Sequence, residues 1–234
     1  MSILTNATDI HLSFTSGSVL VQRSAAMSMG CWVQSSTWNG GSAVSMLSLV
    51  LSGTTGVQKG TRGGNAIDVW SWGGALAVST YGLVYTPTAN TWMHVMYTYD
   101  GTTHSLYSNG TLLATSTAAV TPGGLNQLYV NGYPTGVTNE TSATSIDDVV
   151  LFNRCLSYAE VQILSEQTLL SSGIFNGLLA NYDFCGPSGS VVSGSVPDLS
   201  SNHSDLTVVN GGAGTSLFYA PCASSLHAIC LPLT

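Results

Sequence analysis

Short runs of alternating apolar and polar residues, separated by Gly, Ser, Thr and Asn, fill residues 8–152. Such runs are typical of half-buried strands, and they cover Ile10–Phe14, Ser18–Gln22, Met29–Ser35, Ser45–Ser52, Ala66–Trp72, Ala75–Thr80, Trp92–Tyr99 and Ser145–Phe152. No helical period falls between them, which argues against a parallel sheet built from alternating strands and helices. The pattern therefore predicts an all-β fold of two antiparallel sheets packed as a sandwich.

Two dipeptides in residues 92–117 indicate tight turns. Asp100-Gly101 and Asn109-Gly110 favour the positive φ angles that hairpin turns require. Between them, residues 104–108 alternate as a half-buried strand does. We expect a β-meander here.

One helix is predicted after the last of these strands. Ser157 and Glu160 have the spacing of a capping box, in which each side chain binds the other residue's backbone amide. Val161, Leu164 and Leu169 follow as an apolar stripe, and Gly173 is a plausible stop. The helix should lie across the sandwich edge or close one of its ends.

Composition excludes several classes of partner. Only 6% of the 234 residues are charged, four of them cationic, and the net charge is −7. Nucleic acids and anionic membranes are bound through clustered Lys and Arg, so neither is expected as a partner. The longest apolar run, residues 43–51, is too short for membrane insertion. No cation precedes Arg23, so no secretory signal peptide is expected.

Candidate chemistry is sparse. Five cysteines occur without a C-x-x-C pair. We expect free thiols that act as small buried hydrophobes, and Cys222–Cys230 is the best candidate for a disulfide. No nucleophile elbow or zinc-binding helix motif is present. Asp147 and Asp148 are adjacent in a predicted strand and should point to opposite faces, so they should not form the carboxylate pair of a glycoside hydrolase. We therefore expect no catalytic residues and no enzyme activity.

Two blocks of sequence resemble a known family. They are Trp92–Gly101 with Leu106–Gly110, and Ser145–Ser157 followed by the capped helix. Both resemble the core and closing strands of concanavalin A-like, laminin G-like domains. The resemblance spans residues 8 to 170 and implies a two-sheet jelly-roll sandwich with one short helix after the closing strand.

The C-terminal residues resemble the start of the same family. Residues 177–184 and 197–211 match its opening strand and loop, although here they follow the closing helix. We interpret this order as a circular permutation, which is tolerated where native termini lie close together. The predicted organisation is a sandwich over residues 1–172 and a segment, 173–234, that completes the same sandwich or a neighbour's.

Candidate binding residues come partly from the resemblance, which suggests a calcium site, and partly from aromatic residues that the resemblance does not cover. Related sandwiches often bind calcium, and Asp147, Asp198 and Asn202 offer suitable oxygen ligands, although no cofactor is required. Asp147 has a structural alternative, in which it accepts backbone amides or pairs with Arg154. Trp70, Trp72 and Tyr133 are candidates for stacking on sugar rings, and packing in a core is the alternative for the tryptophans.

Together these features predict a non-catalytic structural or recognition protein. We expect it on the outside of a particle such as a virion, as a bacteriophage decoration, spike or fibre protein that contacts its own copies or capsid and tail proteins and binds cell-surface glycans. The alternative is a free, extracellular, lectin-like carbohydrate-binding module. A glycoside hydrolase is the third reading.

Overall fold

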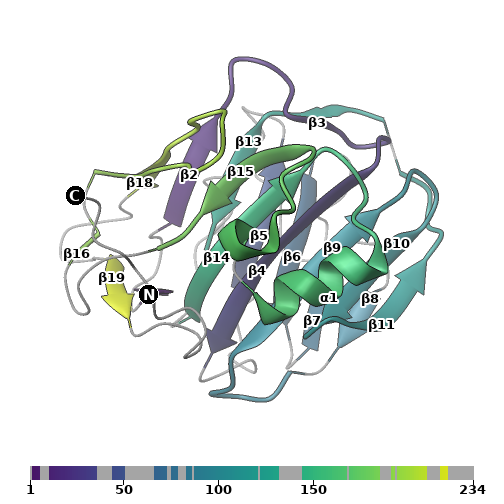
Figure 1. Cartoon of the computed structure of the whole chain (residues 1–234), viewed down its shortest axis with the longest axis horizontal. Coiled ribbons are helices and arrows are strands. Elements are labelled where there is room, and N and C mark those ends of the chain that lie inside the picture. Colours follow the sequence, from purple (N-terminus) through teal and green to yellow (C-terminus); the bar gives the residue numbers. More distant parts are fainter. Residues whose placement is uncertain are drawn as a thin grey trace.

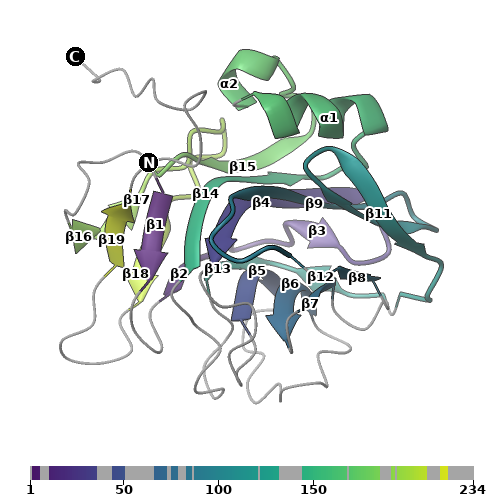
Figure 2. The ribbon, with the colours of Figure 1, turned by 90° about the horizontal axis from the view of Figure 1, so that it is seen from below.

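Two antiparallel sheets face each other, and two short helices cover the outer face of one of them (Figure 1, Figure 2). The computed structural model describes residues 2–5, 11–35, 44–50, 66–72, 75–78, 83–85, 87–120, 122–131, 144–167, 169–184, 191–192, 194–209 and 217–220. The predicted all-β sandwich is confirmed.

Sheet A is the sheet that carries the helices. Nine strands form it in the described part of the chain, in the spatial order β11 (Thr111–Ser116), β10 (His104–Ser108), β9 (Met93–Tyr99), β4 (Met27–Ser35), β14 (Thr144–Phe152), β1 (Ser2–Thr5), β19 (Leu217–Ala220) and β16 (Val191–Val192), with β15 (Leu178–Tyr182) also paired to β14.

Sheet B forms the other layer. Its eight described strands follow the order β17 (Ser195–Val196), β18 (Leu206–Val209), β2 (His11–Thr15), β13 (Gln127–Val130), β5 (Val44–Val50), β6 (Ala66–Trp72), β7 (Ala75–Val78) and β8 (Leu83–Tyr85). A separate pair joins β3 (Val21–Gln22) to β12 (Gly124–Leu125). The strand predicted over 18–22 is thus shorter than expected.

The predicted helix is divided into two. Helix α1 spans Tyr158–Glu166, and the Ser157–Glu160 capping box is present, with the Glu160 amide 3.3 Å from Ser157 Oγ and the Ser157 amide 2.8 Å from Glu160 Oε2. Gln167 is extended and ends α1, and α2 is the single turn Leu169–Ser172. No described helix has the length and apolarity needed to cross a membrane.

Strand β14 is buried on both faces. Val149 and Leu151 belong to the apolar core between the sheets, whereas Val150 and Phe152 join a second core beneath the helices. The alternation of side chains along a strand explains this division. The outer face of sheet A is therefore part of the folded interior wherever α1 and α2 cover it.

The two hairpin turns form as predicted. Gly101 has φ +101°, and Asn109 and Gly110 have φ values of +47° and +72°. A Cβ on Gly110 would lie 2.6 Å from Ser165 Oγ and 3.2 Å from the Cα of Gln162. The β10–β11 turn thus lies directly against α1, where only glycine fits.

One edge of β14 is shared by two strands from distant parts of the chain. Strand β1 pairs with it at Ser145 and Ile146, and β15 pairs with it at residues 149–152. Farther along the C-terminal segment, β18 pairs with β2 and β19 pairs with β1. Strands from residues 173–234 therefore contribute to both sheets.

Candidate functional site

A β-bulge interrupts β14 where its edge passes from β1 to β15. On the opposite edge, Asp147 lies across from Trp32, and Val150 lies across from Gly30. Three steps along β14 thus match two along β4, which is the signature of one extra residue. Asp148 has φ +47°, a left-handed conformation that Asp tolerates better than most residues.

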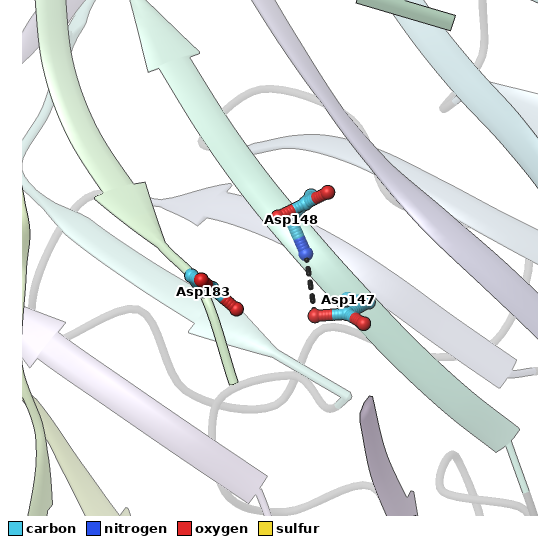
Figure 3. A group of neighbouring side chains, drawn as sticks. All are labelled: Asp147, Asp148 and Asp183. Carbon is cyan, nitrogen blue, oxygen red and sulfur yellow. Dashed lines mark hydrogen bonds between the residues drawn. The ribbon is translucent and has the colours of Figure 1, made fainter. Parts of the chain in front are cut away.

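The bulge brings neighbouring carboxylates together. One oxygen each of Asp147, Asp148 and Asp183 lies within 4.8 Å of the other two, and Figure 3 shows the three side chains grouped where β14 passes the end of β15. The expectation that Asp147 and Asp148 point to opposite faces is therefore wrong. It assumes a regular pleat, and the bulge at Asp148 removes that regularity.

Asp147 is the most buried member of this carboxylate cluster, with 1% of its surface exposed. Burial, together with the negative charges of Asp148 and Asp183, raises its pKa to about 7. Its Oδ1 accepts a hydrogen bond of 3.0 Å from the amide of Asp148. At neutral pH the group holds a proton part of the time, which a cation could replace.

The donor set fits a hard divalent cation. Calcium takes oxygen ligands at 2.3–2.6 Å, so two oxygens on the same ion lie no more than about 5 Å apart, and the cluster meets this limit. Calcium needs six to eight ligands; carboxylates that bind through both oxygens, backbone carbonyls and waters would supply the rest. The three aspartates would hold the ion and supply the negative charge that it neutralises.

The space beside the cluster is small. Asp148 lines a cavity of about 10 Å³ together with His94, Val150, Leu164, Gln167 and Leu169, beneath the helices. That volume admits about one water molecule, and it is far smaller than a sugar ring. Asp147 itself is nearly inaccessible. This geometry suits an ion better than a carboxylate pair flanking a glycosidic bond.

Asp198 and Asn202 lie in a loop docked against β15. Both oxygens of Asp198 accept hydrogen bonds of 2.7–2.9 Å, from the amides of Asn181, Ser200 and Ser204 and from the Ser200 hydroxyl. Asn202 donates its side-chain amide to the Leu179 carbonyl over 2.8 Å. Asp198 thus organises the loop, and Asp147 gathers instead with Asp148 and Asp183.

Arg154, which the sequence offered as a partner for Asp147, forms an ion pair with Glu160. Its guanidinium donates to both carboxylate oxygens of Glu160, over 2.9 and 2.7 Å, and its Nε donates to the Asn176 carbonyl over 2.6 Å. The cation thus ties the capping box of α1 to the chain just before β15.

The predicted sugar-binding aromatics are only partly covered by the structure. Trp70 and Trp72 both occupy β6, opposite Ala77 and Ala75 of β7, and their side chains lie outside the described part of the molecule. Tyr133 also lies outside the described residues.

Solved structures share this fold at low sequence identity. A protein from Bacteroides ovatus ATCC 8483, provisionally named a carbohydrate binding protein, matches with a TM-score of 0.61 and 16% identity over 95% of this chain and 61% of its own length. The binding domains of botulinum neurotoxin serotypes G and D match with TM-scores of 0.53 and 0.51, at 14% and 15% identity, over 70% of this chain and 42% of theirs. This chain thus spans less than two thirds of each of these structures, and at such identities the likeness shows the fold alone.

Sequence comparison gives the family. No curated protein matches the chain. The model of a laminin G-like family within the concanavalin A-like lectin/glucanases superfamily matches residues 6–162, which is more than half of the 234 residues. The chain therefore belongs to the concanavalin A-like lectin/glucanases superfamily.

Proposed function

We propose that this chain is a non-catalytic carbohydrate-recognition module that binds calcium through Asp147, Asp148 and Asp183. The observation that carries the proposal is the convergence of three carboxylates at the β14 bulge, on a fold shared with lectins. Calcium would neutralise the cluster and rigidify the junction of β14, β15 and β1.

Ion binding is tested on the purified full chain by calorimetric titration with calcium after treatment with chelator. We expect one site in the unchanged protein and none in Asp147→Asn. Glu166→Gln is the control, because it removes one exposed carboxylate from α1. Equal affinity in all three proteins would refute the site. Asn202→Ala tests the alternative ligand set of Asp147, Asp198 and Asn202, and loss of binding in this variant would favour that set.

Glycan binding is the second part of the proposal. Trp70, Trp72 and Tyr133 are the proposed stacking residues, because an aromatic ring covers the apolar face of a sugar. The test is a glycan array probed with and without chelator, followed by alanine variants at the three positions. Saturable binding that the variants weaken supports the proposal, and absence of any glycan hit would count against it.

Hydrolysis is the competing function, because a carboxyl group with a raised pKa beside a second carboxylate is also the pattern of an acid–base pair. The cavity at Asp148 leaves no room for a sugar, which favours binding over catalysis. Incubation with a panel of polysaccharides and measurement of released reducing ends decides the matter. Turnover that Asp147→Asn abolishes would replace our proposal.

We further propose that the module is displayed on the outside of a particle such as a virion, in contact with its own copies or with capsid and tail proteins. The scarcity of Lys and Arg supports this, because an outward-facing component needs no cationic groups for binding a packaged genome. Mass spectrometry of purified particles would detect the chain. Its presence only as a free protein in the medium would favour the secreted lectin-like module.

A further inference from the structure

His104 is the first residue of β10 and is fully buried. Its side chain shares a face of the strand with Leu106, which belongs to the core between the sheets. The imidazole is stacked on the ring of Tyr99, with centroids 4.4 Å apart and planes 17° apart, and its centroid lies 6.0 Å from that of Tyr97. The ring therefore occupies a site that excludes water, where a positive charge is disfavoured.

Two hydrogen bonds determine which ring nitrogen carries the proton. Nε2 of His104 lies 3.0 Å from the Ala118 carbonyl oxygen, which can only accept, so Nε2 carries the hydrogen. Nδ1 lies 2.7 Å from the Tyr97 hydroxyl and accepts from it in the neutral ring. One nitrogen donates and the other accepts, a combination that only the neutral imidazole provides.

The Ala118 carbonyl belongs to the segment that leaves sheet A after β11. Residues 117–120 lead toward β12, which pairs with β3 outside that sheet. Ala118 and Val120 are partly buried and pack against the core between the sheets. The hydrogen bond from His104 thus ties this segment to β10 at the margin of the core.

We propose that His104 is an acid-sensitive latch: the neutral ring holds residues 117–120 against the core, and protonation of the ring releases them. A proton on Nδ1 would point at the Tyr97 hydroxyl, which would then have to turn its own hydrogen toward another acceptor. Water can stabilise the new charge only once the segment has moved away. The released form would expose the apolar side chains of Ala118 and Val120.

The neighbours of His104 set the direction of the pH dependence. Asp100, in the turn after β9, is exposed, and its field favours the protonated ring. Burial outweighs that field, so the pKa of His104 lies below its ordinary value of 6.5. Tyr97 and Tyr99, which also contact the ring, are uncharged at acidic pH. The latched form is therefore fully stable above about pH 6.5 and loses stability as the pH falls toward the pKa of the buried ring.

The test uses the full chain in the presence of chelator, so that bound metal plays no part. NMR titration of the imidazole should give a pKa below 6.5 for His104. Hydrogen exchange, corrected for the intrinsic effect of pH, should show that amides in residues 117–120 lose protection between about pH 7 and about pH 5. The loss should be about tenfold for each pH unit between the pKa values of the latched and released forms.

Three variants distinguish the latch from general unfolding in acid. His104→Phe keeps a flat ring on Tyr99 without a titratable nitrogen, so the exchange of residues 117–120 should no longer depend on pH. Tyr97→Phe removes the donor that favours the neutral ring and should raise the pKa of His104. His203→Asn is the matched control, because His203 is exposed and Asn tolerates its φ of +48°; this variant should keep the pH dependence of the unchanged protein.

Two results from hydrogen exchange would overturn the proposal. One is equal protection of residues 117–120 across the acidic range, and the other is a pH-dependent loss of protection that His104→Phe retains. An NMR pKa of 6.5 or more for His104 in the unchanged protein would also overturn it, whether or not the variants fold. None of these results bears on calcium or glycan binding.

Discussion

Replacing Asp147 by Asn should stabilise the protein in the absence of calcium, and calcium should cancel that advantage. The two side chains have the same shape, and Asn can still accept the hydrogen bond from the Asp148 amide. The variant therefore removes a charge from a site that is 1% exposed and little else. In the absence of a cation, that charge lowers the free energy of unfolding, because burial and the neighbouring carboxylates disfavour the ionised form.

The size of the cost follows from the pKa of Asp147, which rises from 3.8 to about 7 on folding. Between these values the folded protein retains a proton that the unfolded chain releases, so stability falls as the pH rises. The full shift corresponds to about 4 kcal/mol, reached above pH 7. With chelator, Asp147→Asn should thus be nearly neutral at about pH 4 and stabilising by up to about 4 kcal/mol at about pH 8.

Calcium should cancel this difference, because it replaces the proton and compensates the buried charge. At ~1,000 times its dissociation constant, a ligand stabilises the folded state by about 4 kcal/mol, and the variant should gain little of this. The assay is urea unfolding at both pH values, with chelator or with calcium. If, in the presence of chelator, Asp147→Asn changes the free energy of unfolding by the same amount at both pH values, our account of a buried carboxylate repelled by its neighbours is wrong.

Three further changes test other parts of the structure. Glu160→Gln should cost about 1 kcal/mol of stability at neutral pH, because it breaks the ion pair with Arg154. That ion pair lowers the pKa of Glu160 from 4.5 to about 2, so the loss of stability should fade as the pH falls through this range. A loss that does not depend on pH in urea unfolding would contradict this account. Gly30→Ala should cost about 1–3 kcal/mol, because its Cβ would lie 2.6 Å from the Val95 carbonyl oxygen; thermal unfolding measures the loss, and an unchanged midpoint would contradict it. Removal of residues 173–234 takes strands from both sheets, so circular dichroism should show no cooperative unfolding, and a folded, monomeric remainder would refute the assignment of this segment to the sandwich.

Local sequence rules predicted the parts of the fold that depend on local chemistry. The positive φ angles at Gly101 and Gly110 follow from turn residues whose conformational preferences act within a few positions. The capping box at Ser157 and Glu160 likewise needs only four consecutive residues. The division of the helix at Gln167 was not foreseen, because the apolar stripe continues to Leu169 and gives no sign of an interruption.

The carboxylate cluster depends on long-range pairing, and the sequence rules missed it for that reason. Alternation along a strand separates Asp147 from Asp148, and no residue pattern announced the bulge that cancels the rule. Asp183 reaches the site because β15 runs antiparallel beside β14. The family resemblance of residues 177–184 contained the only signal, since placing that strand beside β14 would have brought Asp183 close to Asp147.

The position of β1 between β14 and β19 also affects how the protein is made. Ile3 pairs with Ile146 on one side and with Tyr219 on the other, so a ribosome must synthesise most of the chain before this strand has either neighbour. Contacts so distant in sequence slow folding. Residues 2–5 must therefore remain unpaired until residues 217–220 have been synthesised, and sheet A can close only then.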